Sequence, residues 1–342
     1  RLIGGARRRT PRARFLLDAL ARLEKSLPAH QRLIVAKGRP ETLIPRLVAD
    51  VGATRLTFNR DTTPFARTRD AEVRRRAEKA GVHVTACKDR VGFEADQVRK
   101  PDGGSYVVYS PYARRWYQHI ADEPMRPRRA PRLPAAIPDL ESRPLPAPDG
   151  AAAGATLPTA GSEAARRRLQ QFLERGIGTY QDDRDRPDRD GTSRLSPHLR
   201  FGTISIRDCL YTARDAAVAE PGLGAGTRKW IDELVWREFY AAILETHPQM
   251  RSHSFRREYD GLAWRNDERE FEAWLEGRTG YPIVDAGMRQ LRTTGWMHNR
   301  VRMIVASFLT KDLLVDWREG ERAWWNLLVD GDPASNNGGW QW

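Results

Sequence analysis

One stretch of the sequence combines an acid, a base and aromatic rings at helical spacing. In residues 230–240, four such side chains recur three or four positions apart, which places them on one face of a helix. They are Glu233, Trp236, Arg237 and Tyr240. A face that mixes indole and phenol rings with charged groups is poor for a dry core and suits the wall of a polar aromatic pocket. We therefore expect this face to line a ligand site.

A second stretch, 296–303, repeats the pattern. Its aromatic, amide, guanidinium and thioether groups are again spaced for one helix face, and they belong to Trp296, Asn299, Arg300 and Met303. This face also predicts a pocket wall rather than a core.

A third candidate is the hydroxyl-rich run from Gly191 to Pro197. Ser196 can cap a helix whose first turn holds Pro197, and the hydroxyls, free N–H groups and Arg194 would then form an anion site. Many Ser-Pro helix starts bind nothing, so the run is interpreted only together with the two helix faces.

Tryptophan is distributed unevenly along the chain. Ten of the eleven tryptophans lie between Trp230 and Trp342, and the remaining one is Trp116. A surface for stacking bases, a pocket for a planar cofactor and a path for electrons would each explain the excess. An ordinary aromatic core is the fourth explanation.

Composition limits the class of protein. The chain has 342 residues, a formal charge of +13 and no apolar run long enough to cross a bilayer, so we expect a soluble protein of two domains. The charge favours a polyanionic partner such as nucleic acid, although a general basic bias would give the same balance. Cys87 and Cys209 are isolated, which indicates a reducing compartment without disulfides, and the histidines show no metal-ligand spacing.

The elements that must position these side chains divide the chain into three parts. Residues 1–123 alternate β-branched runs with helical stretches, which predicts an α/β Rossmann-like domain with a parallel sheet. Residues 124–161 are rich in Pro, Ala and Gly and form a polyproline-like linker. Residues 162–342 predict an all-α domain. Strands are expected at 33–36, 55–58 and 82–84, and helices at 40–51, 70–80, 163–176, 206–217, 230–246, 268–276, 284–294, 298–309 and 321–329.

Several long motifs, in the same order, closely resemble the photolyase/cryptochrome family, and the nearest branch is the class I cyclobutane pyrimidine dimer photolyases. They are GTSRLSPHLRFG at 191–202, WIDELVWREFY at 230–240, GYPIVDAGMRQLRTTGWMHNRVRM at 280–303, DWREGE at 316–321 and DGDPASNNGGWQW at 330–342. RDTTPFARTRDAEV at 60–73 and YVVYSPYARRW at 106–116 are similar to the family's N-terminal domain. The resemblance implies that the first strand of that domain and the last helices of the helical domain lie outside this sequence. Gly338 and Gly339 would let the backbone come close to a ligand or another helix.

The resemblance implies a U-shaped FAD in the helical domain. Asn336 would face the flavin N5 atom, and a neutral amide there is typical of photolyases. The residues implied to bind the cofactor are Tyr180, Thr192, Ser193, Arg194, Leu195, Ser196, Trp230, Glu233, Arg237, Asp330, Gly331, Asp332 and Asn336. An antenna chromophore of the folate or deazaflavin type is also implied, and Glu94 lies near its expected pocket.

The implied reaction is light-driven repair of pyrimidine dimers in DNA by excited, reduced FAD, on a lesion flipped out of the duplex. Glu233 would hydrogen-bond the dimer, and Trp236, Trp342, Asn299 and Met303 would pack around it. Arg300 and Arg302 would meet flanking phosphates, so binding should weaken with salt. As a family member, the protein is expected to be a cytoplasmic monomer.

The family's chain of electron-carrying tryptophans matches Trp264, Trp317 and Trp340, whereas Trp324 and Trp325 are interpreted as core residues. The main alternative is a cryptochrome that senses blue light without repair. A 6-4 photolyase would be expected to have histidine and apolar residues at the positions of Asn299, Arg300 and Met303. A flavin-free module that stacks single strands is the hypothesis outside the family.

Overall fold

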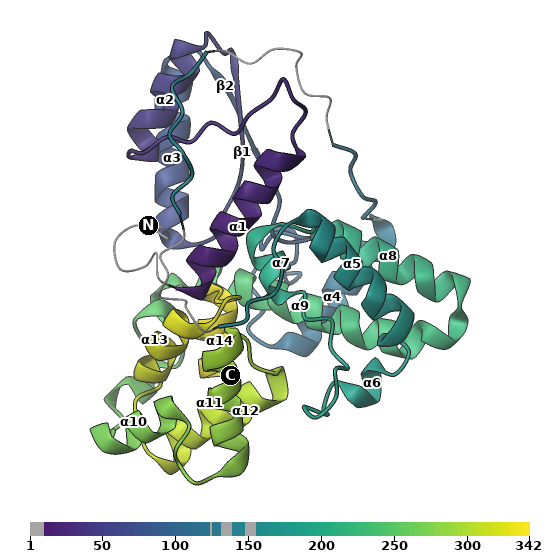
Figure 1. Ribbon diagram of the computed structural model, residues 1–342, viewed down its shortest axis with the longest axis vertical. Helices are drawn as coiled ribbons and strands as arrows, with labels where there is room; N and C mark the ends of the chain where they lie inside the picture. The colour runs from purple at the N-terminus through teal and green to yellow at the C-terminus, as the bar shows by residue number, and fades with distance from the viewer. Residues whose placement is uncertain (1–9, 124, 131–138, 148–154) are drawn as a thin grey trace.

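The first part of the chain forms a small α/β unit at one end of the molecule (Figure 1). The computed structural model describes residues 10–123, 125–130, 139–147 and 155–342. Strands β1 (Arg55–Asn59) and β2 (His83–Cys87) pair in parallel, from Arg55 opposite His83 to Asn59 opposite Cys87. Helix α3 (Pro64–Lys79) connects them and packs with α2 (Pro40–Asp50) over an apolar cluster. Buried members of that cluster are Val48, Ala77 and Val82.

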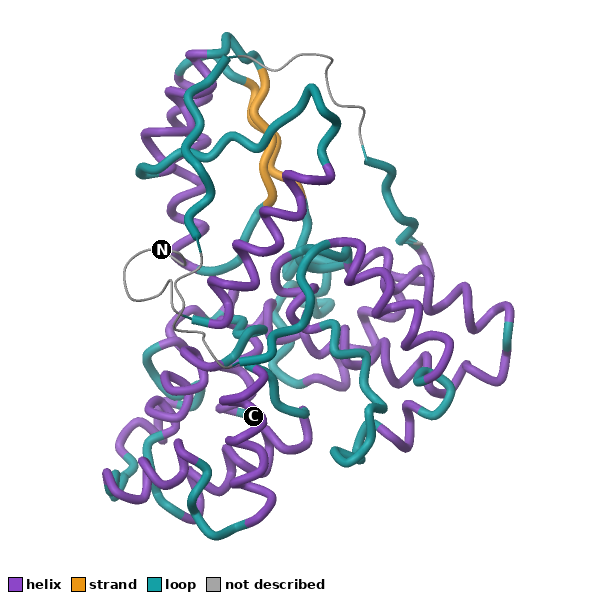
Figure 2. The backbone as a smooth tube through the Cα atoms, in the orientation of Figure 1, coloured by secondary structure: helices purple, strands orange, loops and turns teal. Residues whose placement is uncertain are grey.

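The strand expected at 33–36 is wrong, because this segment does not join the sheet. The N–H group of Val35 donates to the Ser142 hydroxyl at 2.9 Å, and its carbonyl accepts from the N–H of Arg143 at 2.9 Å. Linker residues therefore take the hydrogen bonds that a neighbouring strand would have used. Figure 2 draws both segments as loops. The rest of the expected linker includes 131–138 and 148–154, which lie outside the described residues.

Helices dominate from residue 162 onward, as the periodicity predicts. The longest is α9 (Gly224–Thr246), which contacts α4, α6, α8 and α14 and so forms the axis of this region. The helices are α5 (Ser162–Arg175), α6 (Tyr180–Asp183), α7 (Ser196–Phe201), α8 (Ile206–Ala219), α9, α10 (Glu268–Glu276), α11 (Pro282–Thr294), α12 (Asn299–Ser307), α13 (Trp317–Leu327) and α14 (Pro333–Gln341).

Two helices that precede the linker pack against this helical region. Helix α4 (Tyr109–Asp122) packs Tyr112 against Phe239 of α9, with the ring centroids 5.3 Å apart. The indole N–H of Trp116 donates to the carboxylate of Glu238 at 2.7 Å. Helix α1 (Pro11–Ser26) buries Phe15 in a cluster with Val329. The helices before and after the linker thus share cores, although chain order separates them.

A second core joins α10, α11, α12 and α13 beside the C-terminal end of the chain (Figure 1). Its buried aromatic residues are Trp274, Trp324 and Phe308. Within the described ranges, every helix is too short or too polar to span a membrane.

Candidate functional site

The expected face of α9 forms, but its members have different surroundings. An oxygen of Glu233 accepts a hydrogen bond from Nη1 of Arg184 at 2.5 Å. Burial raises the pKa of the Glu233 carboxyl, and the nearby Arg184 guanidinium opposes that effect. The ring of Trp236 stacks on Tyr109 with centroids 3.6 Å apart and planes 4° from parallel. One face of Trp236 is thus already covered by protein.

Arg237 lies on the inner side of the same helix. Its Nη2 donates to the carbonyl of Leu199 at 3.1 Å, and its Nη1 donates to the carbonyl of Arg90. Both contacts are to backbone carbonyls, so the structure gives this expected cofactor ligand a bracing role between α7 and the segment after β2.

The hydroxyl-rich loop leads into α7, but the expected cap at Ser196 is wrong. Helix α7 begins at Ser196 with Leu195 at the N-cap position, and Ser196 instead donates its hydroxyl to Asp330 at 2.6 Å. Among the residues that the structure describes, the backbone N–H groups of Thr192 to Arg194 have no acceptor. Three donors are therefore left for a ligand.

Asp330 binds polar groups from two other parts of the chain. Its Oδ2 accepts from Ser196 and from Nη2 of Arg302 at 2.8 Å. Its Oδ1 is buried and has no hydrogen-bond partner among the described residues. Arg302 also donates to the carbonyl of Met297 at 2.8 Å, so this expected phosphate contact is engaged inside the protein.

The C-terminal motif forms helix α14 over residues 333–341. Asp332 caps it by accepting from the N–H groups of Ala334 at 3.0 Å and Ser335 at 3.1 Å. A Cβ added at Gly338 would lie 2.2 Å from Tyr240, whereas one at Gly339 would meet nothing within 4 Å. Gly338 thus serves the close approach of α14 to α9. Asn336, one turn after the cap, is buried with its amide 3.4 Å from the carbonyl of Glu321.

The carboxylate of Asp332 is also the centre of a buried arginine cluster, which we call the Asp332 junction and define as Arg90, Arg200, Arg237 and Asp332. Arg90 forms an ion pair with Asp332, and Nε of Arg200 lies 3.6 Å from the same oxygen. Burial opposes ionisation of Asp332, but the guanidinium groups of Arg90 and Arg200 outweigh it and hold its pKa far below the ordinary range. Sequence reasoning missed Arg90, because a lone arginine after a strand carries no pattern.

The second expected face is only partly a helix face. Helix α12 begins at Asn299, with His298 as its N-cap, so Trp296 lies before the helix and the expectation that it shares the face is wrong. Arg300 pairs with Asp185, its Nε 3.1 Å from the carboxylate, and Met303 is 54% exposed. These two side chains face outward, as a contact to a large ligand requires.

The expected electron-carrying tryptophans lie in different environments. Trp317, at the start of α13, is buried beside the guanidinium of Arg318, and Trp264 is half-buried. Trp340 packs on Trp324 with centroids 4.7 Å apart. Trp324 is a core residue, as expected, whereas Trp325 is half-buried under the guanidinium of Arg12 at 3.7 Å.

Tyr180 and Trp230 form an aromatic wall near Glu233. Both are buried and contact Phe172, with centroids at 5.5 Å and 5.2 Å respectively. A flavin dinucleotide needs donors for its phosphates, acceptors for its hydroxyls and apolar walls for its rings. The free amides of the loop, the unpaired oxygen of Asp330 and this wall supply these groups, so the residues present fit FAD.

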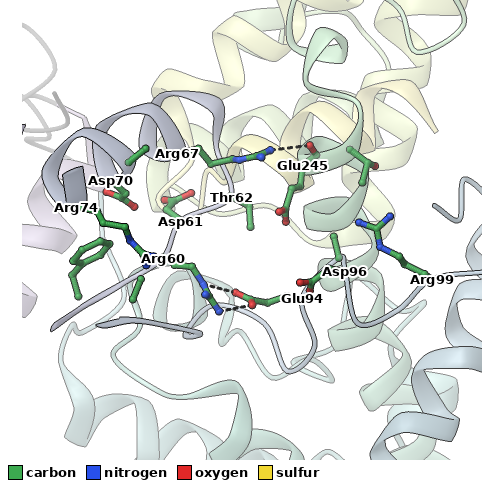
Figure 3. A pocket seen from close by; sticks show the side chains of 15 residues that line it. Arg60, Asp61, Thr62, Arg67, Asp70, Arg74, Glu94, Asp96, Arg99 and Glu245 are labelled. Carbon is green, nitrogen blue, oxygen red and sulfur yellow. Dashed lines mark hydrogen bonds and ion pairs between the residues drawn. The ribbon is translucent and has the colours of Figure 1, made fainter. Parts of the chain in front are cut away.

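A separate cavity of about 410 Å³ lies where β1 and β2 end and meet α9, and we call it the Arg60 pocket (Figure 3). Its charged lining residues are Arg60, Asp61, Arg67, Asp70, Arg74, Glu94, Asp96, Arg99 and Glu245. Arg60 and Glu94 form a bidentate ion pair across it, with Nε of Arg60 3.0 Å from a Glu94 oxygen. Glu94 thus lines this cavity.

Comparison with known proteins extends these findings. Residues 3–134 match the family model described as DNA photolyase, and residues 230–342 match the one described as FAD binding domain of DNA photolyase. A deoxyribodipyrimidine photo-lyase of Halobacterium salinarum is 43% identical over 97% of this chain and 70% of its own length.

Solved structures show the same relationship. A class III photolyase from Agrobacterium tumefaciens superimposes with a TM-score of 0.88 at 36% identity, covering 97% of this chain and 70% of that one. A cryptochrome from Synechocystis gives 0.80 at 26% identity, with the same coverage. The chain belongs to the photolyase/cryptochrome family.

Proposed function

We propose that this protein is a deoxyribodipyrimidine photo-lyase, which repairs cyclobutane pyrimidine dimers in DNA by light-driven electron transfer from reduced FAD. The observation that carries the proposal is the 43% identity, over 97% of the chain, to a relative named deoxyribodipyrimidine photo-lyase. The outward-facing side chains of Arg300 and Met303 also support the proposal, because they can contact a flat polar lesion beside the aromatic wall of Tyr180 and Trp230.

The cofactor would be held by the 192–196 loop, Asp330 and the wall of Tyr180 and Trp230. When bound, reduced FAD supplies the light-driven electron that opens the cyclobutane ring. Asn336 contributes a neutral amide from a buried position on α14, and it adds no charge near the flavin. Arg237 and Asp332 would act indirectly, by keeping α9, α7 and α14 in place.

The lesion would lie against the exposed end of this site. Glu233, whose carboxylate pairs with Arg184, can accept a hydrogen bond from the N–H edge of the dimer. Trp236, Trp342, Asn299 and Met303 would pack around the dimer. We keep Arg300 as a phosphate contact, because its partner Asp185 is exposed. We assign Arg302 to ordering Asp330, because that carboxylate is buried.

The test follows thymine-dimer loss in damaged DNA, under blue light and in darkness, with FAD-loaded, chemically reduced protein. Repair only under light is expected, and Glu233→Ala should lower the repair yield per absorbed photon. Asp188→Asn, which changes an exposed pair with Arg186, is the matched control and should leave the yield unchanged. Dimer loss in darkness would contradict the proposal.

We also propose that Trp264, Trp317 and Trp340 carry electrons toward the flavin site during photoreduction. Trp264→Phe should abolish light-driven reduction of bound oxidised FAD by an external donor. Repair by enzyme that was reduced chemically should persist, because that route bypasses the tryptophans. Trp325→Phe should change neither measurement, and loss of repair itself in Trp264→Phe would contradict the assignment.

The second candidate is a blue-light cryptochrome, which the similarity to the Synechocystis cryptochrome keeps open. Tight FAD binding without repair, in light or darkness, would favour it. In either case, we propose the Arg60 pocket as the site of an antenna chromophore, folate or deazaflavin. A second chromophore would add an absorption band, and an action spectrum that follows FAD alone would exclude it.

A further inference from the structure

The loop that leads into α7 has a backbone bend that residues with side chains rarely adopt. Arg194 has a φ of 49°, in the left-handed region. For a residue with a Cβ atom this conformation costs free energy, so it persists only where the surroundings hold it. The loop is the one whose free N–H groups fit the phosphates of a dinucleotide.

A single side chain of α5 holds this loop. Nε of Arg168 donates to the carbonyl of Ser193 at 2.9 Å, and its Nη2 donates to the carbonyl of Thr192 at 2.8 Å. The same Nη2 lies 3.3 Å from Asp190, whose carboxylate also pairs with Nε of Arg194 at 2.8 Å. A planar guanidinium can serve two neighbouring carbonyls at once, which a lysine ammonium does poorly.

Holding the two carbonyls also orients the N–H groups of the same peptide planes. In a trans peptide the C=O and N–H bonds point in opposite directions, and none of the described peptide bonds is cis. The N–H groups of Ser193 and Arg194 therefore point away from Arg168. Neither has an acceptor among the described residues.

We propose that Arg168 is a positioning residue for FAD, which turns the amides of Ser193 and Arg194 toward the cofactor's phosphates. The inference rests on the proposed function, since it assumes that FAD binds in this loop. Arg168 itself does not contact the cofactor. It holds the strained loop in the binding conformation before the cofactor arrives, so that binding does not include the free-energy cost of ordering the loop.

The experiment measures the dissociation constant of FAD and, separately, the denaturant midpoint of the cofactor-free protein. Arg168→Met should weaken FAD binding roughly 10- to 100-fold, because it removes charge-assisted hydrogen bonds that orient two donors. Arg168→Lys keeps the charge and bulk and should fall between wild type and Arg168→Met. It also guards against a variant that fails to fold.

The matched control is Arg167→Gln on the same helix, whose side chain pairs with the exposed Glu163. Its FAD affinity should equal that of wild type, and the midpoints of all cofactor-free variants should agree closely. An unchanged FAD affinity in Arg168→Met would overturn the inference, as would a loss of affinity matched by an equal loss of stability. Absence of FAD binding by wild type would instead refute the proposed function.

Discussion

The Asp332 junction and the Arg60 pocket contain the same kinds of residues in opposite surroundings. At the junction, Arg90 and Asp332 form an ion pair whose side chains are only 16% and 9% exposed. At the pocket, Arg60 is 45% exposed and faces a cavity. Burial therefore decides whether an arginine-carboxylate pair holds the fold or stays accessible to a ligand.

Asp61 links these two regions. It lines the Arg60 pocket and also accepts from Nη1 of Arg90 at 3.2 Å, while Arg90 reaches Asp332 at the start of α14. The pocket at the ends of the strands and the helix that carries Asn336 are therefore joined through one guanidinium. If burial decides the role of these pairs, substitutions at the junction should destabilise the protein more than substitutions at the pocket.

The largest effect is expected for Asp332→Ala. This change leaves the buried Arg90 and Arg200 without their carboxylate and removes the cap of α14. The free energy of unfolding should therefore fall by about 3–5 kcal/mol. Urea denaturation monitored by tryptophan fluorescence would measure it. A loss under about 1 kcal/mol would show that the junction is not held by its charges.

The second largest effect is expected from acid, which should destabilise the protein through His198 on α7, the helix that also carries Arg200. Burial lowers the pKa of His198 on α7 to about 4 from its ordinary 6.5. The unfolded chain therefore binds a proton that the folded chain refuses, and stability should fall by roughly 3 kcal/mol as pH drops from 6.5 to 4.

In His198→Gln, the free energy of unfolding measured as a function of pH should lack this slope. Asp332, whose pKa is lowered, would add its own loss only below the ordinary aspartate range, so the two windows are separable. An identical slope in wild type and His198→Gln would contradict the assignment.

Asp61→Asn should have an intermediate effect. The amide keeps the shape but loses the charge that faces Arg90, and Arg90 still retains Asp332, so we expect a loss of about 1 kcal/mol in denaturant unfolding. A double-mutant cycle with Arg90→Met would isolate the pair, and zero coupling energy would separate the two regions.

The smallest effect is expected for Glu94→Gln at the pocket. Its pair with Arg60 is partly exposed to solvent, and such pairs contribute about 0–1 kcal/mol. Thermal unfolding of the ligand-free protein should therefore barely change. A loss as large as that in Asp332→Ala would abolish the distinction between the regions.

Local periodicity predicted most of the helices, and the strands β1 and β2, because each depends on neighbours in sequence. It failed at 33–36, where the linker supplied the hydrogen-bond partner, and at Ser196, whose hydroxyl is taken by Asp330 more than 130 residues away. It also failed at Trp296, since a helix start depends on where His298 caps it. Each failure involves a partner or boundary that spacing does not encode.

The sequence by itself determined the fold class, the family and the set of side chains that could form a flavin site, because motifs and periodicity are local properties of the chain. Only the tertiary structure decided which arginines are buried and what they hold. Arg237 braces backbone carbonyls, Arg302 orders Asp330, and Arg168 holds the strained loop. Burial and long-range contact set these roles, and neither is written in the spacing of residues along the chain.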